Sequence, residues 1–267
     1  MTEHDSDSEE LWRDVLTNPN SPIYRYGRVR KHFPGNPRCK LCKVPLAGIA
    51  TPILRLSGMG PSKGNPRFCN ACELWARHHP GGAEVELTLL FADVRGSTGL
   101  AEELGPRDFA ALMQRFYQAS NSVFIESDAF LDKPVGDEVI ALYFPLWGAD
   151  HAAKALRAAR GLLAKTGYGS RNGAWIPIGA GVHTGLAYVG TVGLEGRDGY
   201  DVTALGDAVN VTARLASLAQ AGEVLVSEDA HAASGLDLGD LEHRVLELKG
   251  RSVPLEVRVL TSAAALM

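Results

Sequence analysis

The chain lacks any long hydrophobic run. Its longest uncharged apolar stretch near the N-terminus, VPLAGIATPIL (44–54), is short and contains two prolines, whereas a membrane-spanning helix needs roughly 20 apolar residues. The first ten residues, MTEHDSDSEE, are acidic and contain no apolar segment of the kind found in secretory signals. We therefore expect a cytoplasmic protein with no membrane association.

Cysteine and aromatic residues are scarce, and neither sign of charge dominates. Only four of the 267 residues are cysteines, which in an intracellular chain favours a metal site over disulfides. The formal net charge of -4 excludes a general polyanion binder. A hydrophobic content of 45% is ordinary for a globular protein, so wholesale disorder is excluded. The length allows one large domain and one small one.

The charges are unevenly distributed along the chain. Residues 1–24 carry six acids and one base, residues 25–80 carry eleven bases and one acid, and the remainder is acidic again. This distribution predicts a disordered acidic tail (1–24), a basic segment containing all four cysteines (25–80) and an acidic main domain after residue 80. The sequence His-Pro-Gly-Gly at 79–82 is a strong chain breaker and marks the expected boundary.

Strand and helix patterns alternate in the main domain. Helical spacing of apolar residues predicts helices at 106–127, 150–165 and 207–220. Thr184-Gly185 is interpreted as a hairpin turn between two strands. Short apolar runs predict strands at 85–91, 139–144, 176–182, 186–192, 223–226, 242–248 and 255–260. The order predicts an α+β fold, with helices packed on an antiparallel-rich sheet.

Two aspartates follow or precede predicted strands in positions suited to metal binding. Asp93 ends the first strand and is followed by the turn Gly96-Ser97-Thr98, which suits a phosphate or a metal at a helix start. Asp137 lies in a Gly-Asp turn before the strand at 139–144. If the two strands are neighbours, the carboxylates converge and can hold two Mg²⁺. Taken singly, each aspartate could equally be a helix cap or a plain turn residue.

Asn210 and Arg214 lie four residues apart in the predicted helix 207–220 and therefore share one face. An amide beside a guanidinium can orient a sugar oxygen and neutralise phosphate charge. Alone, the pair could equally belong to a solvated helix face.

Four stretches together resemble the catalytic domain of class III nucleotidyl cyclases, in the order and spacing of that family. They are FADVRGST (91–98), DKPVGDEVIALY (132–143), IGAGVHTGLAYVGTVG (178–193) and DVTALGDAVNVTARL (201–215). The resemblance covers about residues 84–260. It implies a ferredoxin-like domain that forms a head-to-tail homodimer with two composite sites at its interface.

The resemblance also implies a role for individual residues. Asp93 and Asp137, with the Val94 carbonyl, would bind two Mg²⁺ or Mn²⁺ ions, while Asn210 and Arg214 would stabilise the transition state. Residues implied to bind the nucleotide are the purine selectors Lys133 and Thr203, the turn residues Gly96, Ser97 and Thr98, and Lys249 as a triphosphate contact. In such dimers the metal-binding aspartates come from one chain, and the selectors and transition-state pair from the other.

The purine selectors favour ATP as substrate. Lys133 can donate a hydrogen bond to adenine N1, and Thr203 can accept one from the N6 amine, whereas guanine reverses both groups. Thr203 resembles the bacterial subgroup that uses threonine at this position. The predicted activity is conversion of ATP to 3′,5′-cyclic AMP and pyrophosphate. A guanylate cyclase remains the alternative within the family.

The four cysteines form two CxxC pairs, Cys39/Cys42 and Cys69/Cys72, each closely preceded by Asn-Pro-Arg. Two such pairs can complete a tetrahedral four-thiolate site, so we expect structural zinc, with an iron–sulfur cluster or redox-active thiols as alternatives. A helix is expected at 70–78. The eleven bases of this segment allow a rival function, a zinc-dependent nucleic-acid-binding protein with a degenerate cyclase domain. Because all six catalytic positions are filled, we consider nucleic acid an unlikely partner.

Overall fold

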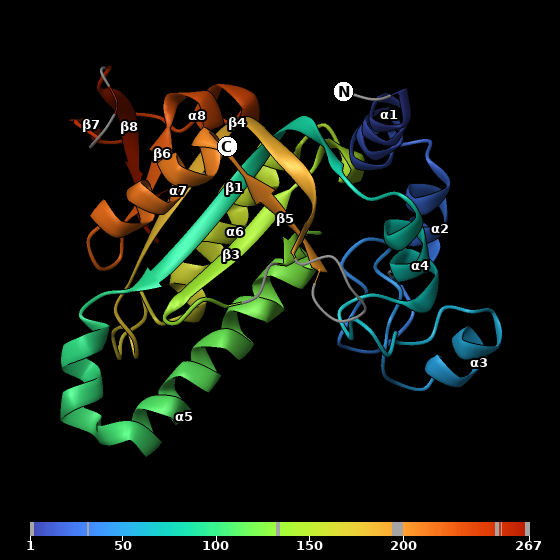
Figure 1. Cartoon of the computed structure of the whole chain (residues 1–267). Helices are drawn as coiled ribbons and strands as arrows, with labels where there is room; N and C mark the ends of the chain where they lie inside the picture. Colours follow the sequence, from blue (N-terminus) through green and yellow to red (C-terminus); the bar gives the residue numbers. More distant parts are fainter. Residues whose placement is uncertain are drawn as a thin grey trace. The chain divides into compact units, whose positions relative to one another are not determined.

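The computed structural model describes residues 3–30, 32–131, 134–193, 200–248, 251 and 253–264. The chain forms two compact units, the first comprising residues 1–85, 145–148 and 187–205, and the second comprising residues 86–144, 149–186 and 206–267 (Figure 1). Within the described ranges, no helix has both the length and the apolar character needed to cross a membrane.

The first unit contains the cysteine segment, a group of short helices and a β-ribbon. Its helices are α1 (Glu3–Thr17), α2 (Pro22–Arg30), α3 (Thr51–Leu56), α4 (Asn70–His78) and the 3₁₀ helix η1 (Pro145–Trp147). Its ribbon is formed by the end of β4 (Ile178–Gly193), which pairs antiparallel with β5 (Tyr200–Leu205). Helix α4 has the bounds that the sequence predicted.

Helix α1 corrects the expectation of a disordered tail. The side chains of Trp12 and Leu16 are fully buried. The Trp12 indole N–H donates to the His79 carbonyl at 2.9 Å, and its ring lies 4.8 Å from that of Trp75. The high acid content of this segment obscured the apolar residues at helical spacing, which supply the burial that orders it.

The second unit is built on a mixed sheet. The strand order of the whole sheet is β2-β3-β1-β4-β6-β8-β7, with β5 paired to β4 off this path. The strands are β1 (Gly82–Val94), β2 (Phe130–Leu131), β3 (Glu138–Tyr143), β4, β6 (Val224–Ser227), β7 (His243–Leu246) and β8 (Leu255–Leu260). Strands β4 and β6 are parallel, while β1–β3, β2–β3, β6–β8 and β7–β8 are antiparallel. The predicted α+β fold is confirmed.

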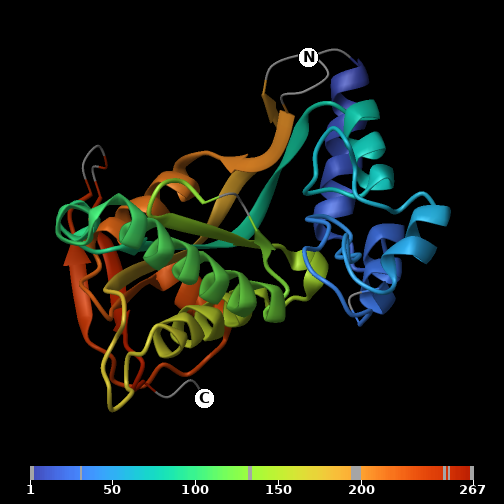
Figure 2. The same ribbon diagram turned by 90° about the horizontal axis from the view of Figure 1, so that it is seen from below.

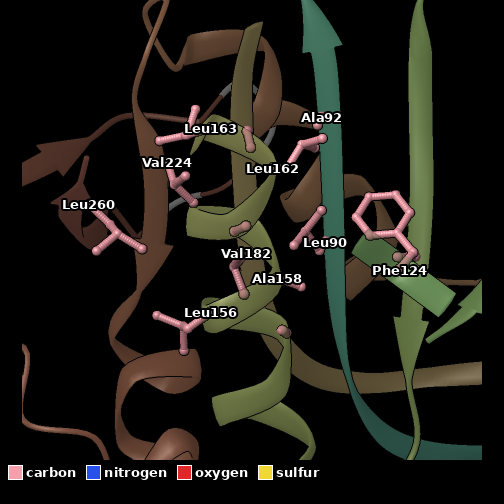
Figure 3. Close-up of a cluster of buried hydrophobic side chains, with 14 of the residues drawn as sticks. Leu90, Ala92, Phe124, Leu156, Ala158, Leu162, Leu163, Val182, Val224 and Leu260 are labelled. Atoms are coloured by element: carbon pink, nitrogen blue, oxygen red, sulfur yellow. The ribbon is translucent and has the colours of Figure 1, made fainter. Parts of the chain in front are cut away.

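Helices cover both faces of this sheet. Helices α5 (Ser97–Glu126) and α6 (His151–Lys165) lie along one face (Figure 2). Leu156, Leu162 and Leu163 of α6 pack in one buried cluster with Leu90 of β1 and Val224 of β6 (Figure 3). Adjacent side chains on a strand point to opposite faces. The next residue of β6, Leu225, accordingly packs in a second cluster with Val211 and Leu215 of α7 (Asp207–Leu218). Helix α8 (Glu228–Ser234) contributes to the first cluster.

Two predicted elements differ from those observed. Thr184-Gly185 does not form a hairpin turn, because β4 runs without interruption from Ile178 to Gly193. A Cβ on Gly185 would lie 3.2 Å from that of Ala208, so this glycine permits close packing against α7 rather than a turn. Helix α5 begins at Ser97, earlier than the expected Pro106. A kink at Gly105, where φ is 75°, separates the predicted part from the preceding turns.

Candidate active site and four-cysteine centre

The structure brings the two predicted metal-binding aspartates together. Asp93 lies at the end of β1, directly opposite Glu138, the first residue of β3. Asp137 precedes Glu138 in the turn, and its carbonyl accepts a hydrogen bond from the Val94 N–H at 3.3 Å. The carboxyl groups of Asp93 and Asp137 interact, and this interaction raises the pKa of Asp93. The antiparallel register of β1 and β3 therefore builds a cluster of three carboxyl groups at one sheet end.

This carboxyl cluster carries the electrostatic signature of a cation site. Partial burial raises the pKa of Asp93, and Asp137 raises it further, although Arg95 acts in the opposite direction. Burial, with the charges of Asp93 and Asp137, raises the pKa of Glu138 to about 7. Because a bound divalent cation would relieve this repulsion, and carboxylate oxygens are the ligands that Mg²⁺ prefers, the residues present fit such an ion.

Arg95 supplies a counter-charge to the cluster. Its guanidinium forms an ion pair with Asp93 and donates a hydrogen bond to the Ser217 carbonyl of α7 at 2.6 Å. The side chain thus ties the carboxyl cluster to the C-terminal end of the helix that carries Asn210 and Arg214.

A polar turn and an open cavity adjoin the carboxyl cluster. Gly96 has a left-handed backbone with φ of 66°, which glycine adopts without strain, and Ser97 and Thr98 form the first turn of α5. Backbone N–H groups at a helix start favour phosphate. A cavity of about 750 Å³ lies between α5 and the turn before β3; it is lined by Ser97, Thr98, Phe109, Tyr117, Gly136 and Asp137. The corner can therefore admit an anionic ligand beside the carboxylates.

The remaining predicted residues lie elsewhere. Asn210 and Arg214 are one turn apart on α7, with Asn210 exposed and Arg214 half-buried. Thr203 lies on β5 in the first unit, half-buried and opposite Gly190 of β4. The two predicted lysines, Lys133 and Lys249, lie outside the described residues.

The four cysteines converge in the first unit, as predicted. The ligand atoms of Cys39, Cys42, Cys69 and Cys72 all lie within 4.8 Å of one another, and all four side chains are buried. Cys42 Sγ lies 3.7 Å from Cys69 Sγ, too far for a disulfide but matching the edge of about 3.8 Å expected for a tetrahedron with Zn–S bonds of about 2.3 Å. One pair lies in a tight loop, and the other in the first turn of α4.

The chemistry of the four-cysteine centre also suits a metal ion. Burial raises the pKa of Cys39, but hydrogen bonds from the other three thiols outweigh it and hold that pKa well below its usual value. Hydrogen bonds with Cys39 raise the pKa of Cys42 and of Cys72 well above theirs. A bound cation would stabilise the thiolate form of all four cysteines.

A family model describing the adenylate and guanylate cyclase catalytic domain matches residues 83–255. The chain belongs to this cyclase family. Catalytic domains of the family use divalent metals and act as dimers on nucleoside triphosphates. The match begins after the four-cysteine segment and includes the carboxyl cluster, β5 and α7.

Two curated relatives of the chain are named adenylate cyclases. The chain is 32% identical over 143 residues to an adenylate cyclase of Anabaena cylindrica, covering 49% of this chain and 27% of that protein. It is 30% identical over 194 residues to adenylate cyclase 1 of Rhizobium meliloti, covering 67% and 28%. The chain thus spans less than a third of the length of these two curated relatives.

Solved structures show the same fold. The guanylyl cyclase Cya2 matches with a TM-score of 0.59 and 26% identity, over 67% of this chain and 93% of that one. The adenylyl cyclase CyaB of P. aeruginosa matches with a TM-score of 0.56 and 26% identity, over 67% and 95%. These likenesses support a nucleotidyl cyclase domain but do not separate adenylate from guanylate specificity.

Sequence reasoning missed three residues that the structure places in or beside the carboxyl cluster. They are Glu138, Arg95 and Tyr117, whose hydroxyl donates to the Gly136 carbonyl. Arg95 follows Val94, and Glu138 follows Asp137, so both lie next to predicted site residues in the sequence. Tyr117 is 20 residues from Asp137 along the chain, and only the packing of α5 brings it there.

Proposed function

We propose that the chain is an adenylate cyclase that converts ATP to 3′,5′-cyclic AMP and pyrophosphate. The observation that carries the proposal is the carboxyl cluster of Asp93, Asp137 and Glu138, placed beside the first turn of α5 in a chain of the cyclase family. In this reaction the ribose 3′-hydroxyl attacks the α-phosphorus, the bond from that phosphorus to the β-phosphate bridging oxygen breaks, and pyrophosphate leaves.

Asp93 and Asp137 would hold two Mg²⁺ or Mn²⁺ ions, with the Val94 carbonyl as a further ligand. When bound, the ions would lower the pKa of the attacking hydroxyl and neutralise triphosphate charge. Ser97 and Thr98, with the N–H groups of the α5 start, would bind phosphate oxygens. These residues therefore provide the polyphosphate half of the site.

Asn210 and Arg214 would provide the transition-state half of the site. The Asn210 amide would orient the ribose, which raises the effective concentration of its hydroxyl. The Arg214 guanidinium would meet the charge that develops on the α-phosphoryl oxygens, where one such donor is worth about 3 kcal/mol. In the proposed head-to-tail homodimer, this pair acts on a nucleotide held by the partner's carboxyl cluster.

Adenine specificity is proposed from Lys133 and Thr203, which match the donor and acceptor pattern of the adenine edge. The names of the Anabaena and Rhizobium relatives agree with this specificity. The likeness to the guanylyl cyclase Cya2 supports guanylate cyclase as the second candidate.

A mixing experiment tests the proposed composite site. Wild-type protein should form cyclic AMP from ATP, whereas Asp93→Ala and Arg214→Ala should each be inactive. In an equimolar mixture that exchanges subunits, half of the dimers are heterodimers with one intact site, so activity should return to about a quarter of the wild-type value. A mixture that stays inactive although native mass spectrometry shows heterodimers would exclude the composite site. Inactive wild-type protein would exclude the proposed activity.

A further inference from the structure

Strand β5 is joined to the four-cysteine centre by charged side chains within the first unit. Asp201 of β5 accepts hydrogen bonds from Lys40 Nζ at 3.2 Å and from Arg67 Nη1 at 3.3 Å. Lys40 lies between the ligand candidates Cys39 and Cys42, and Arg67 lies two residues before Cys69. One carboxylate on β5 thus binds Lys40, which lies within one cysteine pair, and Arg67, which lies just before the other.

Because Lys40 is buried, its ammonium group depends on the contact with Asp201. The Lys40 side chain is 4% exposed and that of Asp201 is 19% exposed. A buried ammonium requires a charged or polar partner, and removal of that partner leaves an uncompensated charge. Lys40 Nζ also lies 3.4 Å from the Val202 carbonyl, so the lysine holds the backbone of β5 as well as its side chain.

The two cysteine pairs are themselves joined at this point. The Lys40 backbone N–H donates to the Arg67 carbonyl at 3.0 Å. The two residues that bind Asp201 are therefore also joined to each other by a backbone hydrogen bond next to the two cysteine pairs. A metal ion bound by the four thiolates would hold Lys40 and Arg67 in place, because both cysteine pairs would then be bonded to the same ion.

Asp201 is also placed to control the residue that the proposed function assigns to adenine. Asp201 and Thr203 are two residues apart on β5, so their side chains leave the same face of the strand. Val202 between them points the opposite way and is fully buried. Asp201, which binds Lys40 and Arg67, and Thr203, the proposed purine selector, thus lie on one short strand.

We propose that Asp201 is a positioning residue through which the four-cysteine centre sets the position of Thr203 and hence the selection of adenine. This inference rests on the proposed function for the role of Thr203, whereas the coupling of the centre to β5 stands without it. The basic residues Lys40 and Arg67 are thereby assigned to an internal anchor rather than to nucleic-acid binding.

The test compares wild-type protein with Asp201→Asn, which keeps the size of the side chain and removes its charge. Metal content should be unchanged. The KM for ATP should rise about tenfold with little change in kcat, and the preference for ATP over GTP should fall about fivefold. Amide hydrogen exchange in residues 200–205 should become faster. Glu9→Gln is the matched control, because it removes an exposed ion pair of the same unit, with Arg13, and should change none of these readouts.

A second variant, Lys40→Met, keeps the buried stem and removes the ammonium, so it should shift the same readouts in the same direction. The effects of the two changes should be less than additive in the double variant, because both changes remove the Lys40–Asp201 ion pair. Wild-type KM, nucleotide preference and exchange in Asp201→Asn would overturn the proposal. Should that variant fail to fold, wild-type values in Lys40→Met would overturn it. If wild-type protein has no cyclase activity, the proposed function fails, and the exchange measurement alone decides whether the centre holds β5.

Discussion

The carboxyl cluster and the four-cysteine centre each bring side chains of one kind together, but they differ in their exposure to solvent. The cysteines are buried, with at most 6% of any of these residues exposed. Asp93 and Asp137 are only partly buried, and a cavity of about 750 Å³ opens beside them. Structural metal sites use all their coordination positions for protein ligands, whereas catalytic sites keep positions open for substrate. From this contrast we propose that the four-cysteine centre stabilises the first unit and that the carboxyl cluster serves turnover.

The largest expected effect comes from the open centre. Asp137→Asn should lower cyclase activity about a thousandfold or more, because it removes a proposed metal ligand. The melting temperature should be unchanged or slightly higher, since the substitution also removes repulsion between Asp137 and its carboxyl neighbours. Cyclic AMP formation and differential scanning fluorimetry on the same preparation measure both. Wild-type activity would remove Asp137 from the metal site.

The next effect concerns the choice of base. Lys133→Glu combined with Thr203→Cys should lower the ATP to GTP ratio of kcat/KM by about 30-fold or more, since two polar matches worth roughly 2–4 kcal/mol together are lost. Competition with both nucleotides in one tube measures the ratio directly. An unchanged ratio would mean that neither residue selects the base.

A smaller effect on stability is expected at the closed centre. Cys72→Ser should weaken metal binding and destabilise the first unit by roughly 3 kcal/mol, which corresponds to about 10 °C in melting temperature. Ser57→Ala, an exposed position of the same unit, serves as the control. If Cys72→Ser retains the wild-type melting temperature and metal content, the centre does not stabilise the unit through a bound ion.

The sequence predicted which side chains come together better than it predicted their surroundings. The two CxxC pairs were identifiable from their local spacing. Asp93 and Asp137 were identifiable only through the resemblance of four stretches of the chain to a known family, because each aspartate alone could be a cap or a turn residue. The sequence also predicted the bounds of α4 and the part of α5 that follows the kink at Gly105. It failed at Gly185, where a glycine serves packing against α7, and at Trp12, whose burial depends on Trp75 and His79 far along the chain. The hydrogen bonds of Lys40 and Arg67 to Asp201 likewise join distant parts of the chain, so no local sequence pattern could predict them.

The most direct test of this division between the centres is metal analysis combined with activity on one desalted sample. Purified protein passed into metal-free buffer should retain about one metal ion per chain at the cysteines, or an equivalent iron–sulfur cluster, and should be inactive. Addition of Mg²⁺ or Mn²⁺ alone should restore cyclic AMP formation from ATP without changing the retained metal. Turnover before any addition, or loss of all metal on desalting with full activity after Mg²⁺, would contradict the account.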